Sequence, residues 1–414
     1  MKSSFLEHTL PNGLRVVCEV MPRVSSAAAG FYVGAGSRHE TPELHGVSHF
    51  LEHMCFKGND RRDCHAINVA FDELGSIYNA FTSKEHTVYY GWVPATRLND
   101  QLELLADLVR PSLPDADFQT ERNVILEEIA MNDDAFERHV GNFLHHAVFE
   151  NHALAHEILG EKETIANMRR EQLVEYHRRR YASDNMTLVA AGNFDPQEFF
   201  AAAGRYCGRW ERAGRNGAPT PPTIATRGVR KLVLEQFKQQ AVAIVYPSVP
   251  EGHAHEDAIE AFTQLFGGPN SRCYWNIVQK GICSQAGAFW LSYRDCGVMA
   301  LYADGEPERC EAMLAALQEQ AREVMERGFR ADEVQRVRNQ RRTQLALEAE
   351  NPRTRLMQVV DDLEVHGYPR TSENRMAAVE AVTEKSIAAH LNEYPITGDG
   401  LVVSIGPRDW PPTA

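Results

Sequence analysis

The sequence predicts an α+β protein built from two homologous domains, each a mostly antiparallel sheet flanked by helices. Segments rich in β-branched and aromatic residues alternate with segments of helical hydrophobic spacing. The order of these segments in the first half returns in the second half, which indicates a duplicated unit. Between the halves, residues 212–228 are rich in Pro, Gly and polar residues, as is typical of an exposed linker. We therefore expect domains at 1–211 and 229–414.

Length and composition agree with this architecture. The 414 residues are too many for one ordinary domain. Hydrophobic residues make up 43% of the chain and charged residues 24%, which is normal for a soluble globular protein. The formal net charge of −14 disfavours nucleic-acid binding, because proteins of that class are usually basic. An acidic surface weakly favours cationic peptide substrates.

The elements of the first half follow from local patterns. The segment 45–57 places Val47, Phe50, Leu51 and Met54 on one helical face. A helix that starts near residue 97 ends near Pro111. Helices are expected at 45–57, 97–113, 117–149 and 170–182, and strands at 14–20, 26–36, 76–93 (as a pair) and 185–194.

The second half repeats the pattern. Strands are expected at 230–237, 240–249, 287–295 and 297–305, and helices at 255–268, 306–327 and 331–349, after which the segment 386–394 leads to an apolar segment at 400–406. When 45–53 is laid on 257–265, His49 aligns with Ala261, Glu52 with Gln264 and His53 with Leu265. The second copy keeps the helix without these polar groups, so the fold does not require them.

The segment SHFLEHMCFKGN at 48–59 contains His49, Glu52 and His53 in the order H-x-x-E-H. Residues four apart lie on one helical face, so the two imidazoles can bind one metal ion. Glu52 lies at the flank, where it can reach a metal-bound water without being a ligand. Zinc bound by two His and one carboxylate keeps a position open for water, and a nearby carboxylate can take the proton of that water. This pattern predicts metallopeptidase chemistry.

Simpler interpretations apply to parts of this segment. With 17 His residues in the chain, an H-x-x-E-H string can also arise by chance. His45 lies four residues before His49 and is expected to be a surface residue at the helix start rather than a ligand. Cys55 points off the histidine face and is expected to be a small core residue.

A third ligand is expected from the acidic segment TERNVILEEIAMNDD. Glu121 and Glu128 are seven residues apart and share a helical face, whereas Glu127 turns away from it. Two carboxylates on one face suit one metal ligand and one partner that orients a ligand. A solvated run of charge is the alternative.

The chain resembles the inverzincin metallopeptidases of the pitrilysin/insulinase type. Within that family it is most similar to the short branch that contains mitochondrial processing peptidase subunits and bacterial homologues. The resemblance rests on HFLEHMCFKG (49–58), YNAFTSKEHTVYY (78–90), ERNVILEEIAMNDD (121–134) and YHRRRYASDNMTLVAAGNFD (176–195). These segments occur in the family's order and spacing across most of the first half.

The resemblance implies one zinc ion per chain. His49, His53 and Glu128 would bind it, Glu52 would be the general base, and Glu121 would orient a ligand without touching the metal. We therefore expect this chain to be a zinc-dependent endopeptidase that cleaves peptides or small unfolded segments.

The resemblance also implies a substrate-binding strand and an overall arrangement. Asn79, Ala80 and Phe81 would lie on an edge strand that pairs with an extended substrate. Two α+β domains would close like a clam around a peptide chamber.

The second half of the sequence departs from the family pattern in one segment. The family stretch of the type R-E-K-R-G-L-x-Y supplies an Arg and a Tyr to the substrate, but the corresponding segment 276–289 has neither. Tyr293 and Arg294 are candidate replacements. A homodimer, or a heterodimer with a same-fold chain that carries the pair, is therefore expected.

Two rival functions belong to other classes. A non-catalytic assembly subunit of the same fold would typically have lost zinc ligands, and this chain keeps all of them. A purely structural metal site would leave Glu52 without a role.

The cysteines and the chain start bear on compartment. The eight cysteines form no C-x-x-C pair, which favours reduced thiols over a disulfide framework. The start MKSSFLEHTLPNGLRVV lacks an apolar signal core, and no apolar run reaches membrane-spanning length. A cytoplasmic location without a membrane span is expected, and prior removal of a targeting segment is the alternative.

Overall fold

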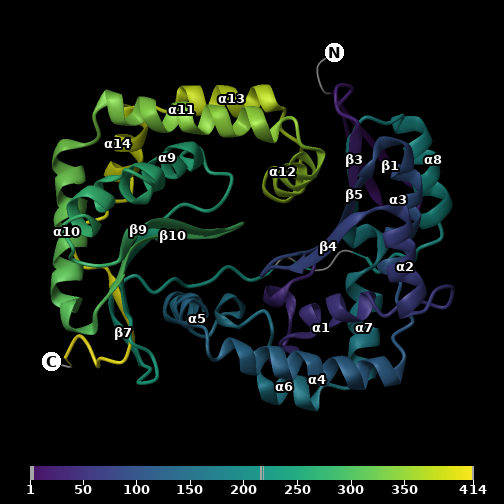
Figure 1. The fold of residues 1–414 in the computed structure, drawn as a ribbon, viewed down its shortest axis with the longest axis horizontal. Helices are drawn as coiled ribbons and strands as arrows, with labels where there is room; N and C mark the ends of the chain where they lie inside the picture. The colour runs from purple at the N-terminus through teal and green to yellow at the C-terminus, as the bar shows by residue number, and fades with distance from the viewer. Residues whose placement is uncertain (1–3, 215–216, 218, 413–414) are drawn as a thin grey trace. The chain divides into compact units, whose positions relative to one another are not determined.

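A computed structural model describes residues 4–214, 217 and 219–412. The chain forms two compact units, and each unit combines separate parts of the sequence (Figure 1). The first unit contains residues 1–132, 156–220 and 347–371, and the second contains 133–155, 221–346 and 372–414. The expected domain division at 212–228 stays a prediction, and its residues 215, 216 and 218 lie outside the described residues.

The first unit is built on a six-stranded sheet with the order β1-β2-β6-β3-β5-β4. Only β2 and β6 run parallel, and all other neighbours are antiparallel. Its strands are β1 (Ser4–Thr9), β2 (Arg15–Val20), β3 (Ser26–Val33), β4 (Ile77–Thr82), β5 (Thr87–Pro94) and β6 (Met186–Gly192). Its helices are α1 (Val47–Cys55), α2 (Cys64–Leu74), α3 (Leu98–Leu108), α4 (Asp115–Asn132), α6 (Lys162–Asn167), α7 (Arg170–Arg180), α8 (Pro196–Cys207) and α12 (Pro352–Val365).

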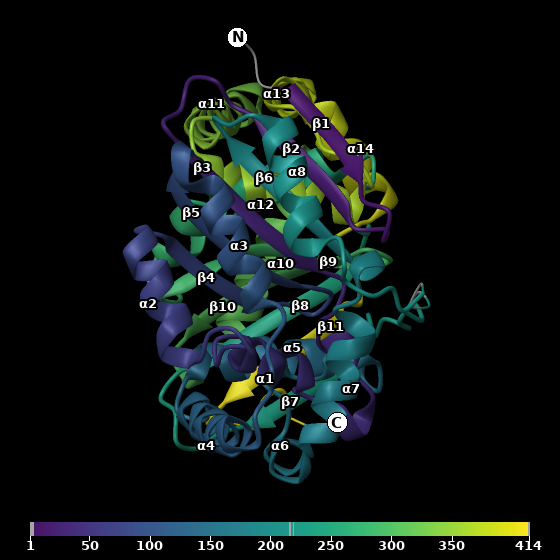
Figure 2. The same ribbon diagram turned by 90° about the vertical axis from the view of Figure 1, so that its right-hand side faces the viewer.

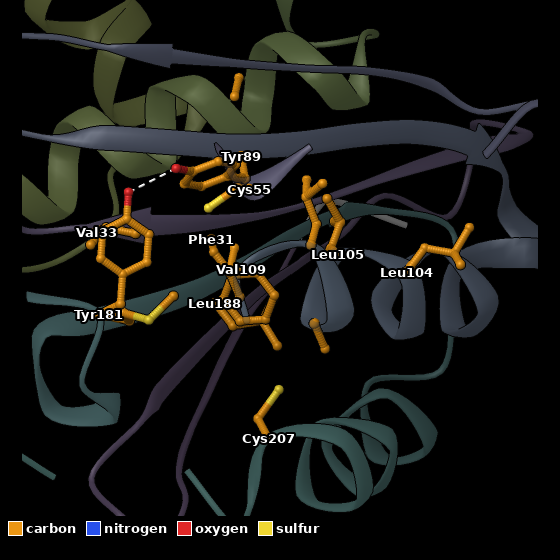
Figure 3. Close-up of a cluster of buried hydrophobic side chains, with 14 of the residues drawn as sticks. Phe31, Val33, Cys55, Tyr89, Leu104, Leu105, Val109, Tyr181, Leu188 and Cys207 are labelled. Atoms are coloured by element: carbon orange, nitrogen blue, oxygen red, sulfur yellow. Dashed lines mark hydrogen bonds between the residues drawn. The ribbon is translucent and has the colours of Figure 1, made fainter. Parts of the chain in front are cut away.

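The main core of this unit lies between the sheet and the helices α1, α3 and α8. Alternating side chains of β3 and β5 face these helices, as expected for a sheet with one face packed on a core. Figure 3 shows Cys55 of α1 beside Tyr89 of β5, with the Tyr89 hydroxyl 2.7 Å from that of Tyr181. Burial raises the pKa of the Cys55 thiol to about 12. Cys55 is therefore a core residue, as predicted.

The opposite face of the first sheet is covered by α12. Leu356, Val359 and Val360 of this helix pack with Val17 and Val189 of the sheet. Both views place α12 next to β3 (Figures 1 and 2). A helix from the second half of the sequence thus completes the first unit.

The second unit repeats the design with a five-stranded sheet of order β7-β11-β8-β10-β9. Its strands are β7 (Gly228–Val233), β8 (Gln240–Ser248), β9 (Gln285–Tyr293), β10 (Cys296–Gly305) and β11 (Leu401–Gly406). Its helices are α5 (Phe136–Phe149), α9 (Glu256–Gly267), α10 (Cys310–Arg327), most of α11 (Ala331–Glu348), α13 (Ser372–Ala381) and α14 (Glu384–Glu393). Helix α5, from the first half of the sequence, packs with β11 on one sheet face.

The two sheets have the same topology. The order β2-β6-β3-β5-β4 in the first matches β7-β11-β8-β10-β9 in the second, and β7 and β11 are again the parallel pair. Helix α1 follows β3 as α9 follows β8. The predicted fold class, a duplicated α+β unit with mostly antiparallel sheets flanked by helices, is confirmed.

Two sequence predictions about elements were wrong. The segment 117–149 is not one helix: α4 ends at Asn132, α5 begins at Phe136, and the two belong to different units. Asp133 and Asp134, which favour turns over helix interiors, stand at this break. Helices α2, α6, α8, α12 and α13 were not predicted. Within the described residues, no helix is both long and apolar enough to cross a bilayer.

One buried ion pair fastens α12 to the sheet. Arg355 Nε of α12 lies 2.8 Å from Glu19 Oε2 of β2, and both residues are 1% exposed. We predict that Glu19→Gln lowers the free energy of unfolding by about 3 kcal/mol or more, because it leaves a buried guanidinium without its counter-charge. Chemical denaturation followed by circular dichroism measures this change.

The exposed pair Arg15–Glu7 on the same sheet is the matched control. Its side chains are 32% and 41% exposed. Glu7→Gln should change the free energy of unfolding by no more than about 1 kcal/mol. Equal effects of the two substitutions would show that the Arg355–Glu19 pair does not hold α12.

Candidate metal centre

Helix α1 presents His49 and His53 on one face. The two residues are one turn apart, and their ring centroids are 4.6 Å apart. The start of the helix is fixed by Glu40, whose carboxylate accepts hydrogen bonds of 2.8 Å from the backbone N–H groups of Gly46 and Ser48. These bonds satisfy backbone donors that the first turn of a helix leaves without partners.

Helix α4 faces α1 with one stripe of residues. Phe118, Glu121 and Ile125 are its buried members. The rings of Phe118 and Phe50 of α1 stack with centroids 4.8 Å apart. Glu128 lies seven residues beyond Glu121, so the stripe that packs on α1 also carries Glu128 toward the histidines.

The three expected ligands converge. Glu128 Oε2 lies 3.7 Å from His49 Nε2 and 3.7 Å from His53 Nε2. All three ligand atoms lie within 4.8 Å of one another. Zinc bonds of the usual length place tetrahedral ligand atoms roughly 3.3 Å apart, so a small inward movement of these side chains suffices. Two imidazoles and one carboxylate are a donor set typical of catalytic zinc, and the residues fit that ion.

Glu121 contacts Nδ1 of His53, the ring nitrogen opposite the one that faces Glu128. Its Oε2 lies 3.1 Å from His53 Nδ1, and its Oε1 lies 2.5 Å from the Lys57 ammonium. Burial favours the neutral acid, but the hydrogen bonds from His53 and Lys57 hold the pKa of Glu121 below its usual value. An ionised Glu121 accepts a hydrogen bond from His53 Nδ1–H, which leaves the lone pair of His53 on Nε2, available to a metal.

Glu52 lies beside the ligands and is held by the sheet. Its Oε2 accepts a hydrogen bond of 2.5 Å from the Thr82 hydroxyl at the end of β4. Burial raises the pKa of Glu52, partly offset by this hydrogen bond and by the nearby His53. A raised pKa suits a general base, because it brings the proton affinity of the carboxylate closer to neutral pH.

The predicted substrate strand is an edge of the first sheet. In the described sheet β4 pairs only with β5, so its other side can accept an additional strand. Asn79 and Phe81 are exposed on β4, whereas Ala80 is buried. Thr82 joins this edge directly to Glu52.

The neighbouring residues differ in how well the sequence predicted them. Glu127 is exposed, as expected from its helical position. The prediction that His45 is a surface residue was wrong: it is 4% exposed, because residues near Gly160 pack against it. The roles of Lys57 and Thr82 were missed. Lys57 lies two residues after the end of α1. No local signal links Thr82 to Glu52, since the two are 30 positions apart.

Tyr293 and Arg294 lie in the second unit. Tyr293 ends β9 and is 8% exposed, and its hydroxyl lies 2.7 Å from His145 Nε2. Arg294 is exposed in the following turn. The engagement of the Tyr293 hydroxyl by His145 within the unit weighs against it as a ready donor to a substrate.

Family models match both halves of the chain. Residues 15–162 match the model described as "Insulinase (Peptidase family M16)", and residues 167–341 match the "Peptidase M16 inactive domain". The first match contains every residue of the candidate metal centre.

Among the curated relatives are bacterial proteins. The chain is 32% identical over 353 residues to the uncharacterized zinc protease YmxG of Bacillus subtilis, covering 84% of this chain and 85% of that protein. It is 33% identical over 387 residues to an uncharacterized zinc protease of Mycobacterium tuberculosis, covering 92% of this chain and 88% of that protein.

Solved structures share the fold. A protease from Helicobacter pylori matches with a TM-score of 0.90 at 19% identity, over 98% of this chain and 100% of that chain. A chain of complex III from Candida albicans matches with a TM-score of 0.84 at 16% identity, over 98% of this chain and 97% of that chain. At these identities the likeness concerns the fold alone.

The positions of Glu127 and Glu128 give a sharp test of the third ligand. We predict that Glu128→Gln loses zinc that the unmodified chain retains through dialysis, because an amide is a weaker ligand than a carboxylate. Glu127→Gln, which removes the same charge from an exposed position one residue away, should retain zinc. Elemental analysis measures the metal content, and equal zinc in the two variants would exclude Glu128 as the third ligand.

Proposed function

This chain belongs to the insulinase family of peptidases, peptidase family M16, and we propose that it is a zinc-dependent endopeptidase. Its substrates are peptides or small unfolded segments. The observation that carries the proposal is the convergence of His49, His53 and Glu128 beside Glu52.

Each residue of the centre has a distinct role. His49, His53 and Glu128 would hold the zinc ion, and Glu121 orients His53 through Nδ1. Zinc in such a site supplies Lewis acidity, which lowers the pKa of water and polarises a carbonyl.

Glu52 takes the proton of the attacking water and delivers it to the leaving amine. The Thr82 hydroxyl donates a hydrogen bond to this carboxylate and so holds it in one orientation. This fixed orientation lowers the cost of reaching the reactive arrangement.

Substrate alignment is the task of β4. An extended peptide that adds to the free edge of β4 forms main-chain hydrogen bonds of the sheet type, which bind backbone largely irrespective of sequence. Asn79, Ala80 and Phe81 contribute this edge. Since Thr82 of the same strand contacts Glu52, the strand that aligns the peptide also positions the base.

The likeness to a complex III chain raises an assembly role as the alternative. That likeness concerns the fold alone. An assembly subunit does not need metal ligands, and this chain has a complete His-His-Glu set. The catalytic role therefore has stronger support.

Partner dependence is part of the proposal. The segment 276–289 lacks the Arg and Tyr that the family supplies to its substrate. We infer that a second chain of the same fold, identical or different, completes the active enzyme.

We predict that Glu52→Gln keeps its zinc and loses about 10²–10⁴-fold in peptide hydrolysis, because the amide keeps the shape of the side chain without its basicity. His53→Ala should instead lose the metal. Parallel elemental analysis and kinetics on a fluorogenic peptide separate the two effects. A metal-free Glu52→Gln variant would show that Glu52 binds the metal, contrary to the assigned role.

We also predict that the chain on its own is a weak peptidase. Loss of one donor to a developing oxyanion costs about 10²–10³-fold, and this chain lacks the family's pair. Addition of a same-fold chain that carries the Arg and the Tyr should raise kcat on the same peptide.

Robust zinc-dependent turnover by the chain alone would contradict partner dependence. Tyr293→Phe and Arg294→Gln would then distinguish two explanations. Lost turnover would show that these residues replace the pair, and unchanged turnover that the pair is dispensable here.

A further inference from the structure

A second cluster of metal-ligating side chains lies in the first unit, apart from the proposed catalytic ligands. Its members are His45, directly before α1; His156, in the loop that precedes α6; and Glu161, at the start of α6. One ligand atom from each lies within 4.8 Å of the other two. We propose that His45, His156 and Glu161 bind a divalent ion of the zinc class, which fastens the segment 156–161 to the start of the catalytic helix.

The two imidazoles are already in contact. Their ring centroids are 3.6 Å apart with an angle of 35° between planes, and His45 Nδ1 lies 3.9 Å from Glu161 Oε1. Burial lowers the pKa of His45, which favours the neutral form that binds metals. His156 is half-buried and the Glu161 side chain is 60% exposed, so both can turn toward an ion.

The backbone around the cluster is held closely. A Cβ on Gly160 would lie 2.3 Å from the His45 carbonyl oxygen, and a Cβ on Gly46 would lie 2.5 Å from the Leu159 carbonyl oxygen. Both glycines have positive φ, 79° and 91°. The two segments therefore approach at a distance that only glycine allows, and the ligands start from fixed positions.

Hydrogen bonds across the two segments add to this rigidity. The Thr164 hydroxyl donates to the His45 carbonyl at 2.9 Å, and the Lys84 ammonium donates to the His156 carbonyl. Lys84 brings a positive charge near the cluster, which the carboxylates of Glu40 and Glu157 counter. A site preformed in this way binds with a small entropic cost of ordering.

The donor set indicates the class of ion. Imidazole nitrogens with a carboxylate suit Zn²⁺, Ni²⁺ and Cu²⁺, whereas Mg²⁺ and Ca²⁺ prefer oxygen donors alone. The role inferred is structural, because the ligands join the entry of α1 to the loop that covers it. If the cluster binds no metal, it is a stack of two imidazole rings next to an exposed carboxylate, and the protein does not respond to zinc.

The test uses the full chain with the proposed catalytic site disabled by His53→Ala. Titration of this variant with ZnCl₂ by calorimetry should show binding of one ion, and zinc should raise its melting temperature. Adding His156→Ala should abolish both responses. Adding Glu161→Gln, at an exposed position, should weaken binding by at least about tenfold, since even partners that only orient a ligand are worth that much.

His65→Ala in the same background is the control, because His65 is an exposed histidine of the first unit outside both clusters. It should leave the affinity for zinc unchanged. The proposal is overturned if the folded His53→Ala variant binds no zinc, or if binding there survives both His156→Ala and Glu161→Gln. Peptidase activity is not measured, so the result is separate from that of the proposed function.

Discussion

The packing of α4 against α1 is the contact on which the candidate metal centre depends. Phe50 and Phe118 stack nearly parallel, with 3° between their planes. This contact sets the rotation of each helix about its axis, because a buried aromatic pair tolerates little displacement. Glu121 and Glu128 then follow from helical geometry, three and ten residues beyond Phe118 on the same stripe. The carboxylates reach the histidines because the core fixes the helices.

The second unit shows that this scaffold does not need the metal. Helix α9 occupies the position of α1, with Ala261 and Leu265 buried where α1 has His49 and His53. Its core contains Phe262 and Phe266. Apolar packing therefore supports folding in both units. The fold does not require the polar residues His49, Glu52 and His53 of α1. This separation explains why the duplicated copy could lose every ligand and keep its fold.

The sequence predicted the convergence of the candidate metal ligands better than the organisation of the chain. His49, Glu52, His53 and Glu128 are close together because α1 and α4 obey simple helical periodicity, which a sequence reveals. The burial of His45 was not predictable, because it depends on a loop more than 100 positions away. The same limit applies to α12. Its apolar stripe shows that one face is buried, but no local pattern states which sheet covers it.

The positions of α5 and α12 follow from the duplication. Each has 14 residues and each follows an 18-residue helix, α4 or α11. They are therefore equivalent elements of the two copies, yet each is grouped with the unit that contains the other copy's sheet. One face of the sheet beside the candidate metal centre is covered by α12, through Leu356, Val359 and the buried Arg355–Glu19 pair. The half of the sequence that carries the candidate metal ligands therefore relies on a helix from the other half to cover one face of its sheet, although that other half carries none of the ligands.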